Sequence, residues 1–235
     1  GFTVIQTVIL SELDGSDGIN RPLINGSPST PDPDYFKWVD RVLEIAGEKG
    51  LYVGLLPTWG DKVDKQWGAG PEIFDEANAR EYGRWLGRRY ADTPNIIWII
   101  GGDRSGEGEN FTVWKAMAEG IKECDKRHLM TYHPQGEHSS SFWFHDETWL
   151  DFNMFQSGHA QRDYAIYRRL LLNDLQKQPI KPVLDGEPRY ENIPIDFKSE
   201  NGRFDDFDVR MTLYQSMFSG ACGYTYGCNE VWQMY

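Results

Sequence analysis

The sequence has few cysteines, no long hydrophobic run and fewer basic than acidic residues. Cys124, Cys222 and Cys228 lack the even number and close spacing of a disulfide framework or a CxxC metal pair. No apolar stretch approaches the roughly 18 residues of a membrane span. The 24 Lys and Arg against 36 Asp and Glu give a formal net charge of −12, which argues against a basic phosphate-binding surface. We therefore expect free thiols, no membrane span and no nucleic-acid partner.

Metal-binding motifs are also missing. Among the 5 histidines, His133, His138, His145 and His159 occur without HExxH and without the paired-His strand motif of metal-dependent barrel hydrolases. We therefore expect no metal and no other cofactor. A metal-dependent hydrolase remains an alternative, which metal analysis of the purified protein would test.

Aromatic residues are abundant, with 9 Trp, 12 Tyr and 12 Phe. Most aromatic side chains of a folded protein simply pack in its core. The number present here exceeds what core filling usually needs, and the faces of Trp and Tyr stack well on sugar rings. The composition is therefore compatible with an oligosaccharide or polysaccharide ligand.

Short apolar runs alternate with helix-period segments along most of the chain. The predicted strands are Phe2–Leu10, Leu51–Leu56, Ile96–Ile100, His128–Tyr132, Phe152–Phe155, Pro182–Leu184 and Ala221–Tyr226. The predicted helices are Asp34–Lys49, Asp75–Tyr90, Thr112–Cys124, Gln161–Gln176 and Asp206–Phe218. Several of the strand runs do not alternate, which is typical of strands covered on both faces.

This alternation predicts an α/β protein with a parallel sheet. Seven strand units approach the eight of a (β/α)8 TIM barrel. Gly1 opens directly into a strand, and no helix follows the last strand. We therefore predict one domain over residues 1–235, a TIM barrel lacking its first strand and last helix. An open seven-stranded sheet is the alternative.

Two apolar runs stop abruptly at glycine and a carboxylate: Ile99-Ile100-Gly101-Gly102-Asp103 and Val183-Leu184-Asp185-Gly186-Glu187-Pro188. Parallel α/β folds keep their chemistry at the carboxyl ends of such strands. If the missing strand is counted first, Asp103 ends strand four and Glu187 ends strand seven. Barrel glycosidases that retain anomeric configuration carry the acid/base and the nucleophile on these strands. Asp103 is alternatively a helix N-cap.

Several strings resemble the apiosidase-like family of glycoside hydrolases, family 140, and together they cover nearly the whole chain in order. They are Pro57–Lys62, Ile97–Arg104, Met130–Pro134, Trp149–His159, Lys181–Pro188 and Val231–Tyr235. The resemblance implies a (β/α)8 catalytic domain, with Asp103 as acid/base and Glu187 as nucleophile. It also implies release of apiose-containing units from the side chains of plant pectin, such as rhamnogalacturonan II.

Other polar and aromatic residues near the predicted strand ends are candidates for substrate binding. Each also has a structural interpretation: a core hydrogen bond, a salt bridge of Arg104 with a loop acid such as Glu107, or a Trp59 that seals the barrel top. His133 and His159 have side chains suited to donating a hydrogen bond to a sugar hydroxyl or to the nucleophile. The candidates are Glu12, Trp59, Arg104, His133, Asn153, Gln156, His159, Asp185 and Tyr226.

The sequence therefore favours a retaining glycoside hydrolase acting on a plant cell-wall glycan. A non-catalytic carbohydrate-binding or structural barrel is the second interpretation. Substitution of Asp103 and Glu187 would separate the two interpretations, because only an enzyme has a turnover that is lost when its catalytic carboxylates are replaced. The oligomeric state is not determined by the sequence.

Overall fold

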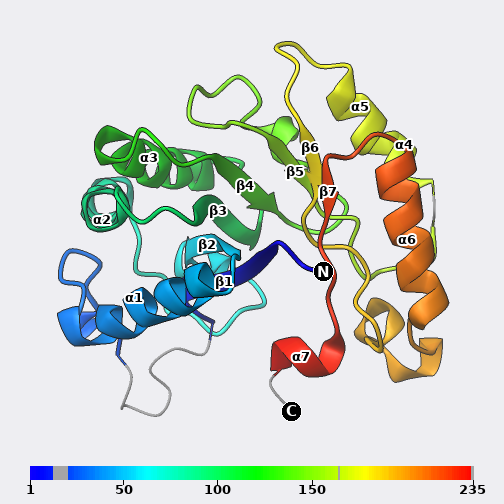
Figure 1. Cartoon of the computed structure of the whole chain (residues 1–235), viewed down its shortest axis with the longest axis horizontal. Coiled ribbons are helices and arrows are strands. Elements are labelled where there is room, and N and C mark those ends of the chain that lie inside the picture. Colours follow the sequence, from blue (N-terminus) through cyan, green and yellow to red (C-terminus); the bar gives the residue numbers. More distant parts are fainter. Residues whose placement is uncertain (13–20, 164, 234–235) are drawn as a thin grey trace. The chain divides into compact units, whose positions relative to one another are not determined.

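The computed structural model describes residues 1–12, 21–163 and 165–233 (Figure 1). The chain divides into two compact units, Gly1–Tyr132 and His133–Tyr235. Each unit contains parallel strands connected by helices. The α/β class predicted from the alternation of strands and helices is therefore confirmed within each unit.

The first sheet has the strand order β1-β2-β3-β4. Its strands are β1 (Val4–Leu10), β2 (Tyr52–Thr58), β3 (Ile96–Arg104) and β4 (Met130–Pro134), of which β4 runs across the boundary between the units. The parallel register pairs Val8 with Leu56 and Leu55 with Trp98. The side chains of Leu55, Leu56 and Trp98 are almost completely buried. As in other parallel sheets covered by helices, the strands read as continuous apolar runs.

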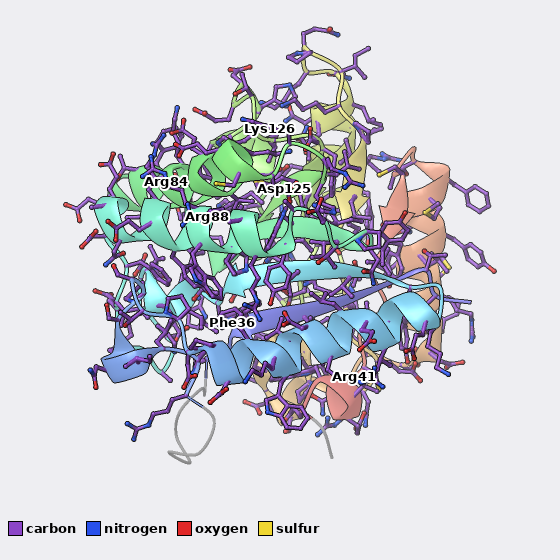
Figure 2. The ribbon with its side chains drawn as sticks, turned by 60° about the vertical axis from the view of Figure 1, so that its left-hand side comes forward. Phe36, Arg41, Arg84, Arg88, Asp125 and Lys126 are labelled. Carbon is purple, nitrogen blue, oxygen red and sulfur yellow. The ribbon has the colours of Figure 1, made fainter. Side chains whose placement is uncertain are left out.

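Three helices lie side by side along this sheet (Figures 1 and 2). They are α1 (Pro33–Glu48), α2 (Glu76–Tyr90) and α3 (Glu109–Cys124), with short 3-10 turns at Ile24–Gly26 and Gly60–Lys62. Local sequence fixes where two of them begin. Asp32 caps α1 just before Pro33, and Asp75 forms a capping box with Asn78 at the start of α2.

The inner and outer surfaces of these helices differ in chemistry. Phe36 of α1 (Figure 2) is fully buried, with its ring centroid 4.5 Å from that of Trp85. On the outer side, Arg80 of α2 forms an ion pair with Glu119 of α3 at 2.9 Å, and Arg84 pairs with Glu123. Exposed pairs of this kind contribute little to stability individually. Burial of the aromatic inner face therefore dominates the packing of these helices.

The second sheet has the order β5-β6-β7. Its strands are β5 (Asn153–Phe155), β6 (Val183–Asp185) and β7 (Gly223–Tyr224), and Leu184 pairs in parallel with both Met154 and Gly223. The helices are α4 (Ile166–Arg169), α5 (Leu171–Leu175), α6 (Asp206–Phe218) and α7 (Asn229–Gln233). Short 3-10 turns occur at Ser140–Phe142, Ile195–Phe197 and Ser199–Asn201.

All seven predicted strands are present, with ends shifted by a few residues. The prediction of one helix over Gln161–Gln176 is wrong, because the described residues of this segment, 161–163 and 165–176, form only the short helices α4 and α5. The buried Arg189 side chain binds the carbonyl oxygens of Gln161 and Asp163 at 2.9–3.0 Å. These tertiary hydrogen bonds hold residues 161–163 outside a helix.

The described residues contain no helix that is long and apolar enough to cross a membrane. All three cysteines are free, and Cys222 is exposed. The single-domain prediction over residues 1–235 and the missing first strand and last helix stay predictions.

Candidate active site

Glu187 lies two residues beyond β6, in the turn between Gly186 and Pro188. Its side chain is only 10% exposed and lies between two imidazoles. The Nε2 atom of His133, on β4, is 3.0 Å from Oε2. The Nε2 atom of His159, which follows β5, is 3.1 Å from Oε1. Each carboxylate oxygen therefore has one imidazole neighbour.

This arrangement determines the charge of the carboxyl group. Burial by itself raises the pKa of Glu187, because a low-dielectric site disfavours the ion. The hydrogen bonds and charge of His133 and His159 outweigh burial and hold the pKa of Glu187 well below its ordinary value. Glu187 is therefore a largely buried carboxylate that is ionised at neutral pH.

Aromatic rings fix the orientation of His159. Its ring centroid is 4.4 Å from that of Tyr190 and 5.7 Å from that of Phe197, both in edge-to-face geometry. The Gly158 amide also donates to the Glu187 carbonyl oxygen at 3.0 Å. Backbone and side-chain contacts thus hold the imidazole and the carboxylate in one arrangement. Tyr190 did not emerge from the sequence as a site residue, since no pattern places it beside His159.

Asp185 lies on β6, two residues before Glu187, and is fully buried. Its carboxylate accepts hydrogen bonds from the hydroxyls of Ser157 and Ser216, both at 3.0 Å. Burial raises the pKa of Asp185 to about 7, although these hydroxyls oppose the change. These contacts favour the structural hydrogen-bonding interpretation of Asp185 over contact with a sugar hydroxyl.

Asp103 lies near the end of β3 in an unusual backbone conformation. Gly101 and Gly102 have φ values of 93° and 134°, and Asp103 itself has a φ of 60°. Only a few per cent of non-glycine residues adopt positive φ, and such strain is concentrated at functional sites. The Asp103 side chain is 22% exposed. It does not cap α3, whose N-cap is Gly108, so the helix-capping interpretation is wrong.

The Asp103 carboxylate accepts a hydrogen bond from the indole nitrogen of Trp67 at 3.2 Å. Arg104, the next residue, has a fully buried side chain. Its guanidinium donates to the carbonyl oxygens of Asp64, Lys65 and Asp103 at 2.6–3.0 Å. It is thus occupied by the backbone, which favours a structural role over binding of a substrate carboxylate.

Lys62 is a second buried cation in this region. Its ammonium donates to Asp61 at 3.0 Å, to the Gly70 carbonyl oxygen at 2.9 Å and to the Glu12 carbonyl oxygen at 3.0 Å. The backbone of Glu12 is therefore anchored to the same loop. Whether the Glu12 side chain contacts substrate stays a prediction.

The remaining predicted binding residues differ in their surroundings. Asn153 is fully buried and bonds the His145 ring at 3.1 Å, which favours a structural role. Gln156 is 4% exposed, and its Oε1 lacks a hydrogen-bond partner among the described residues. Trp59 packs closely on Gly102. The hydroxyl of the half-exposed Tyr226 donates to Glu191 at 2.7 Å.

The structure therefore brings together His133, His159 and Glu187 within the second unit and, separately, Trp67, Asp103 and Arg104 within the first. Among the described residues, no group of three or more His, Cys, Asp or Glu side chains is arranged to hold a metal ion. The prediction of a metal-free site is not tested by this finding. No pattern in the sequence links Trp67 to Asp103.

Comparison with solved structures identifies glycoside hydrolases. A protein described as a glycoside hydrolase is 37% identical, with a TM-score of 0.83 over 100% of this chain and 56% of its own. A glycoside hydrolase family 5 protein from Bacteroides vulgatus is 36% identical, with a TM-score of 0.82 over 99% of this chain and 52% of its own. The chain thus spans about half the length of these two proteins.

A Pseudomonas stutzeri endoglucanase Cel5A crystallised with cellobiose is 14% identical, with a TM-score of 0.68 over 97% of this chain and 71% of its own. At this identity it supports only the fold, which is that of a TIM-barrel glycoside hydrolase and confirms the predicted class. None of the curated proteins compared with the chain matches it. The profile of the family described as "Apiosidase-like, catalytic domain" matches residues 1–235, so the chain belongs to the apiosidase-like family of glycoside hydrolases.

Proposed function

We propose that the protein is a retaining glycoside hydrolase that removes apiose-containing units from plant pectin side chains such as rhamnogalacturonan II. In this proposal Glu187 is the nucleophile and Asp103 is the acid/base. The observation that carries it is the buried Glu187 carboxylate between His133 and His159. Membership of the apiosidase-like family supports the choice of substrate.

The surroundings of Glu187 suit a nucleophile better than a proton donor. A nucleophilic carboxylate must be ionised before it attacks the anomeric carbon, whereas a general acid must be protonated. The two imidazoles favour the ionised form of Glu187, as its lowered pKa indicates. Each oxygen has two lone pairs. An oxygen that accepts one hydrogen bond therefore still has a lone pair with which to attack.

Asp103 has a more exposed environment, and this access is what an acid/base needs. It is more exposed than Glu187, with 22% of the side chain accessible, and the positive φ values of residues 101–103 turn the backbone at the strand end. Proton exchange with a leaving group and then with water requires such access. A retaining mechanism further requires the two carboxyl groups to be about 5–5.5 Å apart across the glycosidic bond.

The proposed reaction has two steps. Glu187 forms a bond to the anomeric carbon while Asp103 donates its proton to the departing glycosidic oxygen. Asp103, now ionised, then removes a proton from water, whose oxygen bonds the anomeric carbon and releases Glu187. His133 and His159 stabilise the carboxylate in the free enzyme and again as it leaves the sugar.

The test is burst kinetics of two variants with an activated aryl apioside and with a rhamnogalacturonan II oligosaccharide. Glu187→Gln should abolish nearly all turnover of both substrates but preserve binding. Asp103→Asn should reduce turnover of the oligosaccharide by about 10²–10⁴-fold. With the aryl glycoside it should retain a measurable first step, because this leaving group needs little protonation, and the covalent intermediate should accumulate.

Two conservative substitutions serve as controls. Glu200→Gln removes an exposed carboxylate of the second unit. Asp92→Asn removes a fully exposed carboxylate of the first unit. Both should leave turnover within about twofold of the parent protein. Near-normal turnover by Glu187→Gln, or equal losses by Asp103→Asn on good and poor leaving groups, would contradict the assigned roles.

A further inference from the structure

Trp67 is an exposed aromatic residue held in a fixed position. Its side chain lies in the loop between the 3-10 turn Gly60–Lys62 and α2, and 63% of the residue is accessible. Its indole N–H donates to Oδ2 of Asp103 at 3.2 Å. The guanidinium carbon of Arg104 lies 4.4 Å from the centroid of the indole ring. A tryptophan that serves only the core would not be so accessible.

The support beneath the indole is rigid. Arg104 binds the carbonyl oxygens of Asp64 and Lys65 in the loop and that of Asp103 on the strand. One buried cation therefore fixes the loop and the strand end relative to each other. Packing is also tight, because a Cβ atom on Gly68 would lie 2.9 Å from Nη2 of Arg104. The ring is thus held in position before any ligand arrives, which lowers the entropy cost of binding.

We infer that Trp67 is the platform on which the leaving-group sugar stacks, and that it positions the Asp103 carboxyl through its indole N–H. This inference rests on the proposed function for the role of Asp103 as proton donor. The proton donor must face the glycosidic oxygen, so a ring hydrogen-bonded to it lies close to that oxygen, and the 63% accessibility of Trp67 leaves its ring open to a sugar. The ligand class is therefore the sugar ring on the leaving-group side of the scissile bond.

The groups around Asp103 within its unit influence the ionisation of its carboxyl. Nη1 of Arg104 is 3.8 Å from Oδ2 of Asp103. The Tyr132 hydroxyl donates to the Arg104 carbonyl oxygen at 2.9 Å. Burial raises the pKa of Tyr132; the charge of Arg104 opposes this change, and the charges of Asp103 and Asp64 add to it. Donation from an indole N–H favours the ionised carboxylate. Loss of this donor should make Asp103 easier to protonate.

The first experiment needs no substrate. In a ¹⁵N-labelled sample, the indole signal of Trp67 is assigned from its absence in Trp67→Phe. Between about pH 8 and about pH 3, this signal should follow one carboxyl ionisation, and Asp103→Asn should abolish that titration. An unchanged titration in Asp103→Asn would overturn the coupling between the two side chains.

The second experiment measures binding of a rhamnogalacturonan II oligosaccharide by calorimetry in the Glu187→Gln background, which prevents turnover. Adding Trp67→Ala should weaken binding by about 3- to 10-fold, whereas Trp67→Phe keeps a ring and should weaken it by less than about threefold. Trp38→Ala, which removes a 71% exposed tryptophan from α1, is the matched control and should leave binding unchanged.

Turnover then separates a specific role from a structural one. In the otherwise unaltered protein, Trp67→Ala should lower kcat/KM for the oligosaccharide. The kcat/KM for an apiosyl fluoride, which has no leaving-group sugar, should stay within about twofold of the parent value. Trp67→Phe should move the basic limb of the rate profile to higher pH, because the proton donor loses its N–H partner.

The failures of the two proposals are distinguishable. Equal oligosaccharide binding with and without Trp67, or equal losses on both substrates, overturns the platform. No oligosaccharide binding by Glu187→Gln, or full turnover by Asp103→Asn, overturns the proposed function instead. The indole titration still decides the contact between Trp67 and Asp103 in that case.

Discussion

Substitution of His159 by phenylalanine isolates the effect of one imidazole on Glu187. Phenylalanine keeps a ring against Tyr190 and Phe197, whose centroids are 4.4 and 5.7 Å from that of His159. It removes the Nε2 contact with Oε1 of Glu187 at 3.1 Å. His133 and the burial of Glu187 are unaltered. The carboxylate therefore loses one of its two imidazole partners but remains buried.

The size of the effect follows from the charge and burial of the pair. A hydrogen bond to a charged group is worth about 1.5–3 kcal/mol, and one pKa unit corresponds to about 1.4 kcal/mol. Since the Glu187 side chain is only 10% exposed, solvent does not screen this loss appreciably. The free energy favouring ionised Glu187 should fall by that amount, which moves the acid limb of the rate profile up by about one to two pH units. Activity near neutral pH should fall less than activity in acid.

The assay is kcat/KM against pH with the activated aryl glycoside, because this substrate depends little on the proton donor. His138→Phe is the matched control, since the Nδ1 atom of His138 contacts the Gly136 carbonyl oxygen at 2.7 Å. It should leave the acid limb in place. An acid limb that does not move in His159→Phe, or that moves equally in His138→Phe, would show that His159 does not set the charge of Glu187.

Two further predictions concern stability and are measured by denaturant unfolding. Burial raises the pKa of Asp185 to about 7, so the protonated side chain contributes fully to the free energy of unfolding below about pH 4, and this contribution is lost as pH rises through about 7. Asp185→Asn, which cannot ionise, should therefore gain stability relative to the parent protein over that interval, by about 4 kcal/mol at most. A stability difference that does not change with pH would contradict the raised pKa. Gly60→Ala should destabilise by more than about 2 kcal/mol, because its Cβ would lie 2.2 Å from the Gly102 carbonyl oxygen, whereas Gly136→Ala meets nothing within 4 Å and should be nearly neutral.

The candidate site was only partly predictable from the sequence. Glycine followed by a carboxylate at the end of an apolar run identified Asp103 and Glu187, because strand ends are recognisable locally. The same reasoning selected His133 and His159, which the structure places against Glu187. It did not find Trp67 or Tyr190, since their contacts with Asp103 and His159 join segments distant in sequence. That Asp103 and Glu187 face each other across one bond stays a prediction.

The sequence by itself determined the order of the elements, because hydrophobic periodicity and caps such as Asp75 are local signals that survive in any tertiary context. Tertiary structure alone decided which polar residues are available for chemistry. The sequence left both a substrate contact and a structural role open for Arg104 and Asp185. In the structure the buried Arg104 guanidinium donates to backbone carbonyl oxygens and the buried Asp185 carboxylate accepts from serine hydroxyls, which favours the structural role for both. The buried Arg189 guanidinium also donates to the carbonyl oxygens of Gln161 and Asp163, which holds residues 161–163 outside the predicted helix. A buried charge requires hydrogen-bond or ion-pair partners, which the fold supplies from segments distant in sequence. A local sequence pattern therefore does not predict which residues those partners are.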